Sequence, residues 1–430
     1  MPRRLPGRAA LTRRARGPVD LSRVRPRRPR SPCQSRPVLP TRARAATAAA
    51  FATQGLVFIS LTTRLPDFAD RWDLSEVALS GLLLVLVLVA GLGSVVAERV
   101  AARRDSATLL RAGLLVMAVA LPTLVLAGTQ AVFVAGIVGY GFALGLVDAA
   151  TNMQGVAVEH RYGRPLLPSL HGCWTLGGLV GAGITLATAT LPLGATAALA
   201  VVPVAAAAAP YLPRVHTPPD PDAVLEAAAV PWRPIVLVGA AMVVFYMVDS
   251  ASAAWGPLYL EDVVAAPERL VALATFPYLL ASLVVRLAGD RLVATYGAVP
   301  VLRVGAVVAA LALAVVVAAP TWPVAVLGFT LLGAGVAVIA PLSFSAAARI
   351  AGGDQARVDA VVARFNQFNY VGGLLGSVLT GLAGAGSLRV GFAVPMVLVL
   401  ALVPLARTFA AGSGPVASPA GRTGPGTRRS

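Results

Sequence analysis

The sequence predicts an all-α membrane protein with twelve transmembrane helices in two groups of six. The first observation behind this prediction is composition, because 57% of the 430 residues are hydrophobic, only 13% are charged and the mean hydropathy is +0.77. Such values argue against a soluble enzyme. The second is a succession of apolar runs, each close to the roughly 20 residues that span a bilayer core. The third is a proline-rich polar stretch that divides these runs.

The apolar runs predict an N-terminal bundle at 45–212 and a C-terminal bundle at 234–410. A linker at 213–233 separates them, and its prolines and mixed charges are typical of a solvated segment. The runs of the N-terminal bundle lie near 45–66, 75–97, 107–127, 130–154, 169–190 and 193–212. Those of the C-terminal bundle lie near 234–260, 270–289, 298–319, 322–345, 358–384 and 388–409.

Both ends of the chain are predicted to be disordered tails. Residues 1–44 hold 14 of the 36 arginines and a single acid, Asp20, and residues 411–430 are rich in Gly, Pro and Ser. Two alternatives for the first segment are a transit peptide, against which its many prolines argue, and a misassigned start of translation. Whether residues 1–44 belong to the mature protein is open.

The arginine distribution predicts which ends of the spans face the cytoplasm. With the N-terminus inside, the outer loops keep four arginines, namely Arg64, Arg71, Arg269 and Arg389, and the tails, the linker and the alternate loops hold the rest. Cytoplasmic loops carry such an excess of basic residues, so both termini are predicted to be cytoplasmic. Because the excess flanks apolar spans, we expect a lipid bilayer around the protein and no nucleic-acid partner.

The loop between the second and third spans carries an acid and a basic residue followed by a basic pair, in the order Ser94, Glu98, Arg99, Ala101, Arg103, Arg104. This pattern resembles the signature of the major facilitator superfamily, although Ser94 and Ala101 replace its two glycines. Gly289-Asp290-Arg291 is a looser copy in the second half. The resemblance implies the superfamily fold, two pseudo-symmetric six-helix bundles with a substrate site between them at the midplane. It also implies that these charged residues stabilise one state of a cytoplasmic gate.

Two further stretches resemble a bacterial inner-membrane branch related to sugar permeases of the fucose-permease type. They run from Gly145 to Gly178 and from Asp249 to Leu260. The resemblance implies a monomeric secondary transporter that moves a small solute, such as a sugar, by alternating access with protons. The chain has no phosphate-binding loop followed by Lys-Ser/Thr, so we expect transport to draw on a gradient. No cofactor, metal site or enzymatic activity is expected, since no metal-ligand spacing or nucleophile-base pair is visible.

Asp249 is the first candidate for a transport site, because an ionisable residue near the bilayer centre is costly and is commonly functional. It lies about midway along the seventh span, with Tyr246 on the same helical face. It is predicted to take up a proton or to contact substrate hydroxyls. The alternative is a hydrogen bond that only packs two helices.

Asp148 in the fourth span is the second candidate carboxylate. Asn152 follows at i+4 and extends a polar stripe, while Gln54 is the strongly polar group midway in the first span. Resembling permeases carry a protonatable acid in this helix. The alternative is that Asp148 and Asn152 pair with the signature loop or with arginines at the inner face.

The eleventh and seventh spans supply the remaining candidates. Asn366 and Tyr370 share a face of the eleventh span, in a stretch that also holds Arg364 and Asn369. Amides and aromatic rings of this kind suit sugar recognition. Trp255 is predicted either to stack on a substrate or to anchor the outer interface. Two other functions stay open, an exporter of lipophilic cations on the same fold and a membrane sensor or scaffold that does not transport.

Overall fold

The computed structural model describes residues 40–101, 103–214 and 230–410, and within these ranges the regular secondary structure is entirely helical. Residues 1–39 and 411–430 of the predicted tails and residues 215–229 of the predicted linker lie outside the described residues, whereas residues 40–44, predicted to belong to the N-terminal tail, are helical. The side chain of Arg269, one of the predicted outer arginines, also lies outside them.

The first half of the molecule runs from α1 to α7. Helix α1 begins at Pro40, ahead of the predicted start at 45, and proline is favoured in the first helical turn. The elements are α1 (Pro40–Thr62), α2 (Leu65–Trp72), α3 (Glu76–Ala101), α4 (Ser106–Val125), α5 (Gln130–Tyr162), α6 (Leu167–Ala187), the 3-10 helix η2 (Leu193–Ala200) and α7 (Val201–Ala207).

The second half runs from α9 to the end of the described chain, and several of its spans are divided into shorter elements. They are α9 (Trp232–Leu258), η3 (Tyr259–Val263), η4 (Glu268–Ala274), α10 (Phe276–Tyr296), α11 (Ala298–Ala318), α12 (Trp322–Val336), α13 (Ile339–Ala351), α14 (Gln355–Phe365), α15 (Gln367–Ala383), α16 (Leu388–Val399), α17 (Leu402–Leu405) and η5 (Ala406–Ala410).

In the part of the chain that the structure describes, ten helices are long and apolar enough to cross a membrane, by length and composition. The sixth predicted span corresponds to the shorter apolar segment Leu193–Ala207, and the eleventh is divided at Asn366 between α14 and α15. Together these twelve spans confirm the predicted all-α transmembrane fold.

Helix α2 occupies a segment that the sequence analysis assigned to the outer loop. Its apolar residues recur at helical spacing, so that Phe68 and Trp72 both pack on Phe133 of α5, with ring centroids 5.7 and 5.0 Å apart. Pro66 lies in the first turn, and Asp73 ends the helix in the left-handed conformation. Hydropathy missed the helix because it is short and half polar.

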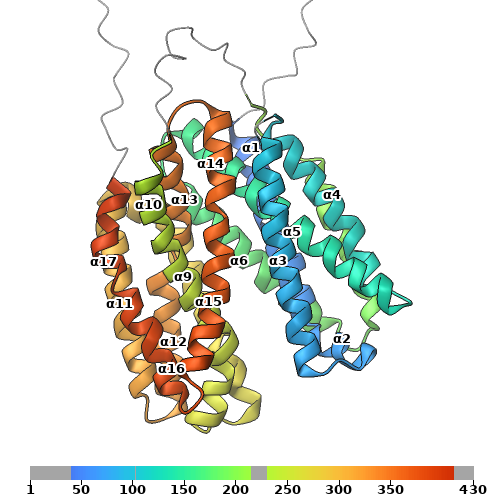
Figure 1. Cartoon of the computed structure of the whole chain (residues 1–430), viewed down its shortest axis with the longest axis vertical. Helices are drawn as coiled ribbons and strands as arrows, with labels where there is room; N and C mark the ends of the chain where they lie inside the picture. The colour runs from blue at the N-terminus through green and yellow to red at the C-terminus, as the bar shows by residue number, and fades with distance from the viewer. Residues whose placement is uncertain (1–39, 102, 215–229, 411–430) are drawn as a thin grey trace, which may run out of the picture. The chain divides into compact units, whose positions relative to one another are not determined.

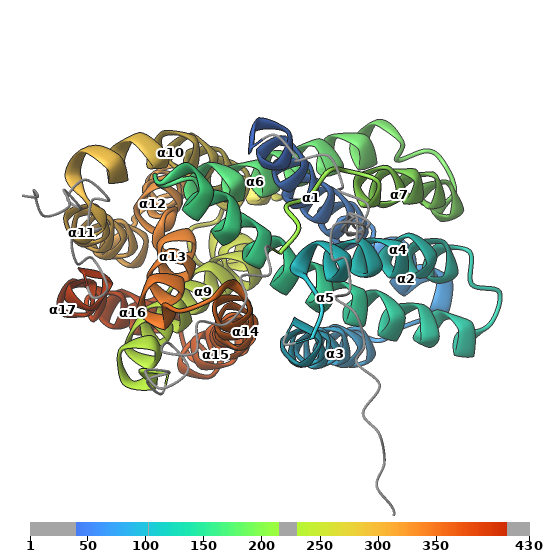
Figure 2. The ribbon, with the colours of Figure 1, turned by 90° about the horizontal axis from the view of Figure 1, so that it is seen from above.

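The same packing pattern is repeated in both halves (Figures 1 and 2). In the first half α1 packs on α6, α3 on α5 and α4 on α5. The counterparts in the second half are α9 on α15, α10 on α12 and α11 on α12. Between the halves, α3 packs on α14 and α6 packs on α10, and we call these contacts the α3–α14 seam and the α6–α10 seam.

Glycines set the closest helix approaches, because a residue without a side chain lets two helix backbones come together. A Cβ at Gly145 of α5 would lie 1.9 Å from the carbonyl oxygen of Ala90 in α3. A Cβ at Gly376 of α15 would lie 2.2 Å from the carbonyl oxygen of Met247 in α9. These positions therefore exclude any larger side chain unless the helices move apart.

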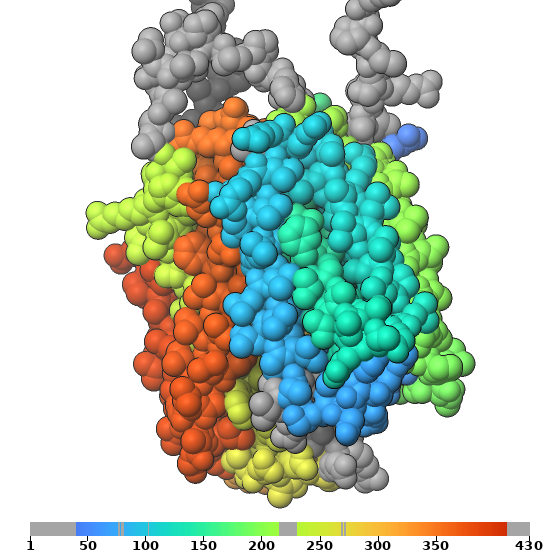
Figure 3. All heavy atoms as spheres, turned by 45° about the vertical axis from the view of Figure 1, so that its right-hand side comes forward, coloured from blue at the N-terminus to red at the C-terminus, as the bar shows by residue number. Residues whose placement is uncertain are grey.

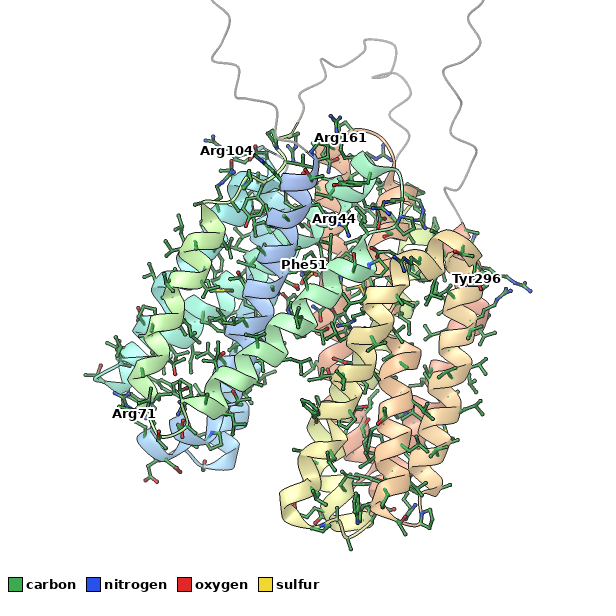
Figure 4. The ribbon with its side chains drawn as sticks, turned by 180° about the vertical axis from the view of Figure 1, so that it is seen from behind. Arg44, Phe51, Arg71, Arg104, Arg161 and Tyr296 are labelled. Atoms are coloured by element: carbon green, nitrogen blue, oxygen red, sulfur yellow. The ribbon has the colours of Figure 1, made fainter. Side chains whose placement is uncertain are left out.

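Arg104 and Arg161 lie at one end of the bundle, which we call the arginine-rich end, and Arg71 lies at the opposite end (Figure 4). The three predicted outer arginines whose side chains are described all bind carbonyl oxygens at helix C-termini. Arg64 donates to Thr188 after α6, Arg71 to Val125 at the end of α4, and Arg389 to Ala319 after α11. A cation is favourable there, which gives these exceptions to the charge asymmetry a structural role.

Candidate functional site

Asp148 of α5 is the centre of a hydrogen-bond network between the two halves. From the first half, Gln54 Nε2 of α1 donates to Asp148 Oδ1 at 3.0 Å. From the second half, three groups around the start of α15 donate to Asp148 Oδ2: Asn366 Nδ2 at 2.8 Å, Asn369 Nδ2 at 3.1 Å and the Tyr370 hydroxyl at 3.4 Å. The carboxylate thus binds amides and a phenol, and its described partners include no arginine.

The break between α14 and α15 allows Asn366 to take this position. Asn366 is fully buried and belongs to neither helix, although its backbone keeps a helical conformation. Its amide also donates to Ser94 Oγ of α3 at 3.4 Å, and Ser94 Oγ donates to the carbonyl oxygen of Ala363 at 3.2 Å. The serine that replaces the first signature glycine is therefore part of the contact between the halves.

Two amide oxygens beside Asp148 lack hydrogen-bond partners among the described residues. They are Oδ1 of Asn152, which is 2% exposed, and Oδ1 of Asn366, which is 0% exposed. Asn152 uses its nitrogen on the backbone carbonyl of Asp148, at 2.9 Å. Each of these two amides therefore has one polar atom without a described partner. A buried polar atom in this state favours an occupant that can hydrogen-bond to it.

Asp249 of α9 has a simpler environment within the second half. Its Oδ1 accepts a hydrogen bond from the Tyr278 hydroxyl of α10 at 2.6 Å. Tyr246 lies where α9 packs on α15, since a Cβ at Gly372 would lie 2.8 Å from its own Cβ. The structure thus gives the two candidate carboxylates different hydrogen-bond partners.

Trp255 lies farther along α9 and packs against the C-terminal part of α15. Its Nε1 donates to the carbonyl oxygen of Ser377 at 2.9 Å, and a Cβ at Gly381 would lie 2.4 Å from its ring. The indole is therefore engaged in packing α9 on α15, away from the residues that bind Asp148.

The signature acid Glu98 reaches across the α3–α14 seam. It forms an ion pair with Arg364 of α14, whose guanidinium also lies 4.9 Å from the ring centroid of Trp232. Neither Arg99 nor Arg103 forms an ion pair with a described residue. Thus the partner of Glu98 lies in the other half and is not the adjacent arginine.

The copy of the signature acid, Asp290, reaches across the α6–α10 seam. Its Oδ1 accepts a hydrogen bond from the backbone N–H of Ser169 at 2.9 Å, in the first turn of α6, where a carboxylate is favourable. Arg286 donates to Thr175 Oγ1 at 2.5 Å and to the Ala337 carbonyl at 3.0 Å. Among described residues neither Arg286 nor Arg291 forms an ion pair with Asp290.

The polar contacts between the halves lie from the arginine-rich end to about the middle of the spans. On α3 they involve positions 91 to 98, and on α6 positions 169 to 175. Figure 3 shows α3 side by side with α14 and α15 along the first seam. Across the described ranges, no hydrogen bond joins the halves near the opposite end. The halves are therefore held together at the arginine-rich end.

Sequence reasoning missed several residues of this arrangement. Tyr278, the partner of Asp249, lies 29 positions away on another helix, and Thr175 lies 111 positions from Arg286. No local pattern links such pairs. Asn369 stands in the polar stretch that the sequence singled out, and its i+3 spacing from Asn366 was the available signal.

Comparisons with known proteins agree with this fold. Residues 3–164 match the profile of the family described as Major Facilitator Superfamily. An uncharacterized MFS-type transporter of Yersinia pestis is 28% identical over 375 residues, which cover 84% of this chain and 94% of the relative.

Two solved transporters share the architecture. The fucose:proton symporter FucP of E. coli superposes with a TM-score of 0.70 at 14% identity, over 85% of this chain and 98% of FucP. The proton:xylose symporter XylE superposes with a TM-score of 0.66 at 12% identity, over 85% of this chain and 94% of XylE. At these identities the likeness concerns the fold.

Proposed function

We propose that this chain, which matches the major facilitator superfamily over residues 3–164 and shares the fold of solved transporters, is a proton-coupled secondary transporter of a small polar solute in which Asp148 couples the proton. The observation that carries this proposal is the set of four hydrogen bonds that Asp148 accepts from both halves. Alternating access requires the halves to move relative to each other. A carboxylate that hydrogen-bonds to both halves can therefore link a change in its protonation to that movement.

Protonation of Asp148 provides the coupling step. Hydrogen bonds to an ionised carboxylate are roughly twice as strong as bonds between neutral groups. A proton on Asp148 would therefore weaken its bonds to Asn366, Asn369 and Tyr370 together and loosen the contact between α5 and α15. Loss of that proton on the other side of the membrane would restore the contact.

The solute that fits this environment carries hydroxyl groups. The unpartnered amide oxygens of Asn152 and Asn366 would accept hydroxyl hydrogens, and Asp249 with Tyr278 offers a second polar contact. A sugar or polyol presents many donors and acceptors at close spacing. We propose this class, with one copy of the chain as the transporting unit.

We also propose that the protein lies in a bacterial inner membrane with the arginine-rich end in the cytoplasm. The support is the asymmetry of arginine along the chain, together with the positions of Arg104 and Arg161 opposite to Arg71 (Figure 4). A protease added to right-side-out vesicles should then cleave an epitope inserted beside Asp262 and spare one attached to the C-terminus.

The test is transport by the purified protein in liposomes that contain a pH dye. Pooled sugars and polyols are added to one sample and pooled lipophilic cations to another, with wild type, Asp148→Asn and the control Asp262→Asn, an exposed acid outside the network. We expect a pH change with the sugar pool in wild type and control and none in Asp148→Asn. A response only to the cations would favour the exporter, and a silent dye with both pools would contradict proton coupling.

A further inference from the structure

The segment that follows α7 is fixed to the first half by the side chain of Gln154 in α5. Gln154 is fully buried, and it donates from Nε2 to the carbonyl oxygen of Leu212 at 3.0 Å and accepts at Oε1 from the Leu212 N–H at 3.1 Å. Its Nε2 also donates to Ser106 Oγ at 3.0 Å. This two-way pairing satisfies both backbone groups of Leu212 and sets the course of the chain just before the linker.

Two residues later, Arg214 reaches from this fixed point into the second half. Its Nη2 lies 2.8 Å from Asp359 Oδ2 of α14 and 2.7 Å from the carbonyl oxygen of Ala101 at the end of α3. The side chain of Arg214 is 8% exposed and that of Asp359 is 0% exposed. The other carboxylate oxygen of Asp359 accepts a hydrogen bond from Gln355 at 2.7 Å.

We propose that residues 211–214 form a strap that holds the arginine-rich end closed and that Gln154 and Arg214 are positioning residues of the transport cycle. The inference rests on the proposed function, since it assigns the strap a role in alternating access. Gln154 fixes the strap to the first half, and Arg214 joins it to α14 of the second half. Opening this end must separate Arg214 from Asp359.

Burial determines which ion pair of the α3–α14 seam controls this opening. The Glu98–Arg364 pair is partly exposed, with side-chain exposures of 20% and 54%, and pairs of this kind contribute little. Breaking a buried pair by removing one partner leaves an uncompensated charge and is far more costly. We therefore assign the stability of the closed state to Arg214–Asp359 more than to the signature pair.

The position of the strap distinguishes it from an ordinary structural contact. An ion pair within one half would stabilise that half in every state of the cycle. Arg214 instead contacts the end of α3 and the side of α14 at once, across the seam that must separate. Its loss should change the distance between the halves, which a purely structural role would leave unchanged.

The test measures that distance without any solute. Spin labels are attached at Arg104→Cys and Tyr296→Cys, two exposed positions at the arginine-rich end in opposite halves (Figure 4), after Cys33→Ser and Cys173→Ser remove the native thiols. We expect mainly short distances for the wild-type strap. Arg214→Ala should raise the long-distance population at least about tenfold, since the unpaired Asp359 disfavours the closed state.

Further variants separate the strap from a folding defect. Arg214→Lys keeps the charge and should restore most of the short-distance population, whereas Gln154→Leu should raise the long-distance population with the ion pair intact. The doubly neutral Arg214→Gln/Asp359→Asn leaves no unpaired buried charge, so it should fold and give a smaller shift than Arg214→Ala. The matched control is Arg161→Ala, which removes an exposed arginine at the same end.

The outcomes distinguish this inference from the proposed function. A distance distribution that is the same in wild type, Arg214→Ala and Gln154→Leu overturns the strap, even if the protein transports sugars. An equal shift in Arg161→Ala also overturns it, because net charge would then be the cause. A shift confined to the strap variants supports it even if no solute is transported, and only the proposed function then fails.

Discussion

The two intramembrane carboxylates, Asp148 and Asp249, have opposite relations to the boundary between the halves. Asp148 accepts hydrogen bonds from α1 of its own half and from three residues of the other half. The hydrogen bond that Asp249 accepts comes from Tyr278, in the same half. When the halves separate, the environment of Asp148 changes and the Asp249–Tyr278 contact can persist.

This difference favours separate roles for the two acids. A proton-coupling group must have different surroundings in the two states of the cycle, and Asp148 meets that condition through its contacts with α15. A group that only binds solute needs surroundings that stay fixed, as those of Asp249 can. Variants of each acid therefore test whether the two carboxylates have separate roles.

The largest effect is expected for Asp148→Asn. The amide cannot exchange a proton, so solute-driven proton movement should fall by at least about 100-fold, the scale on which loss of a positioned proton-transfer group acts. Exchange of solute across the membrane without a proton gradient should continue. The measurement is proton flux in liposomes alongside solute counterflow. Retained proton flux would reverse the assignment of the two acids.

Asp249→Asn should act mainly on solute affinity. Loss of a charge-assisted hydrogen bond should raise KM about tenfold, with coupling retained. Tyr278→Phe should cause part of the same increase, and the double variant should add little, because the two groups act together. The measurement is a double-mutant cycle on solute uptake. Additive effects would show that Asp249 and Tyr278 contact the solute independently.

A smaller effect is expected for Glu98→Gln in the α3–α14 seam. Its ion pair with Arg364 is partly exposed, so its loss should change the transport rate by about two- to fivefold and leave solute affinity unchanged. Asp290→Asn provides the counterpart in the α6–α10 seam. For both variants, the transport rate and the KM of solute uptake are measured. Lost solute binding in a folded variant would contradict a gating role.

The smallest effect on transport is expected for Arg71→Gln, at the end opposite to the arginine-rich end. Arg71 binds the carbonyl oxygens of Val125 and Ala127, and the loss of such hydrogen bonds should lower the unfolding free energy by about 1–3 kcal/mol. Transport per folded molecule should stay at the wild-type value. Thermal unfolding in detergent and uptake normalised to folded protein provide the two readings. A change in coupling would indicate that this end takes part in the cycle.

Much of the fold could be predicted because it depends on properties that are local along the chain. The length and composition of each apolar run indicate a span. Where tertiary packing overrides local pattern, the prediction was wrong. Helix α2 was assigned to a loop, although contacts with Phe133 stabilise it.

The membrane architecture, the candidate acids and the polar face of the eleventh span could be predicted without a structure, because hydrophobicity, charge and helical spacing are properties of neighbouring residues. Which acid joins the halves depends instead on contacts between distant segments. Asn366 lies 218 positions from Asp148, and Asp359 lies 145 positions from Arg214. The position of a residue along a helix determines which face it lies on and how deep it lies in the membrane. Its partners in the other half depend on how the two bundles pack, and no local sequence pattern encodes that contact.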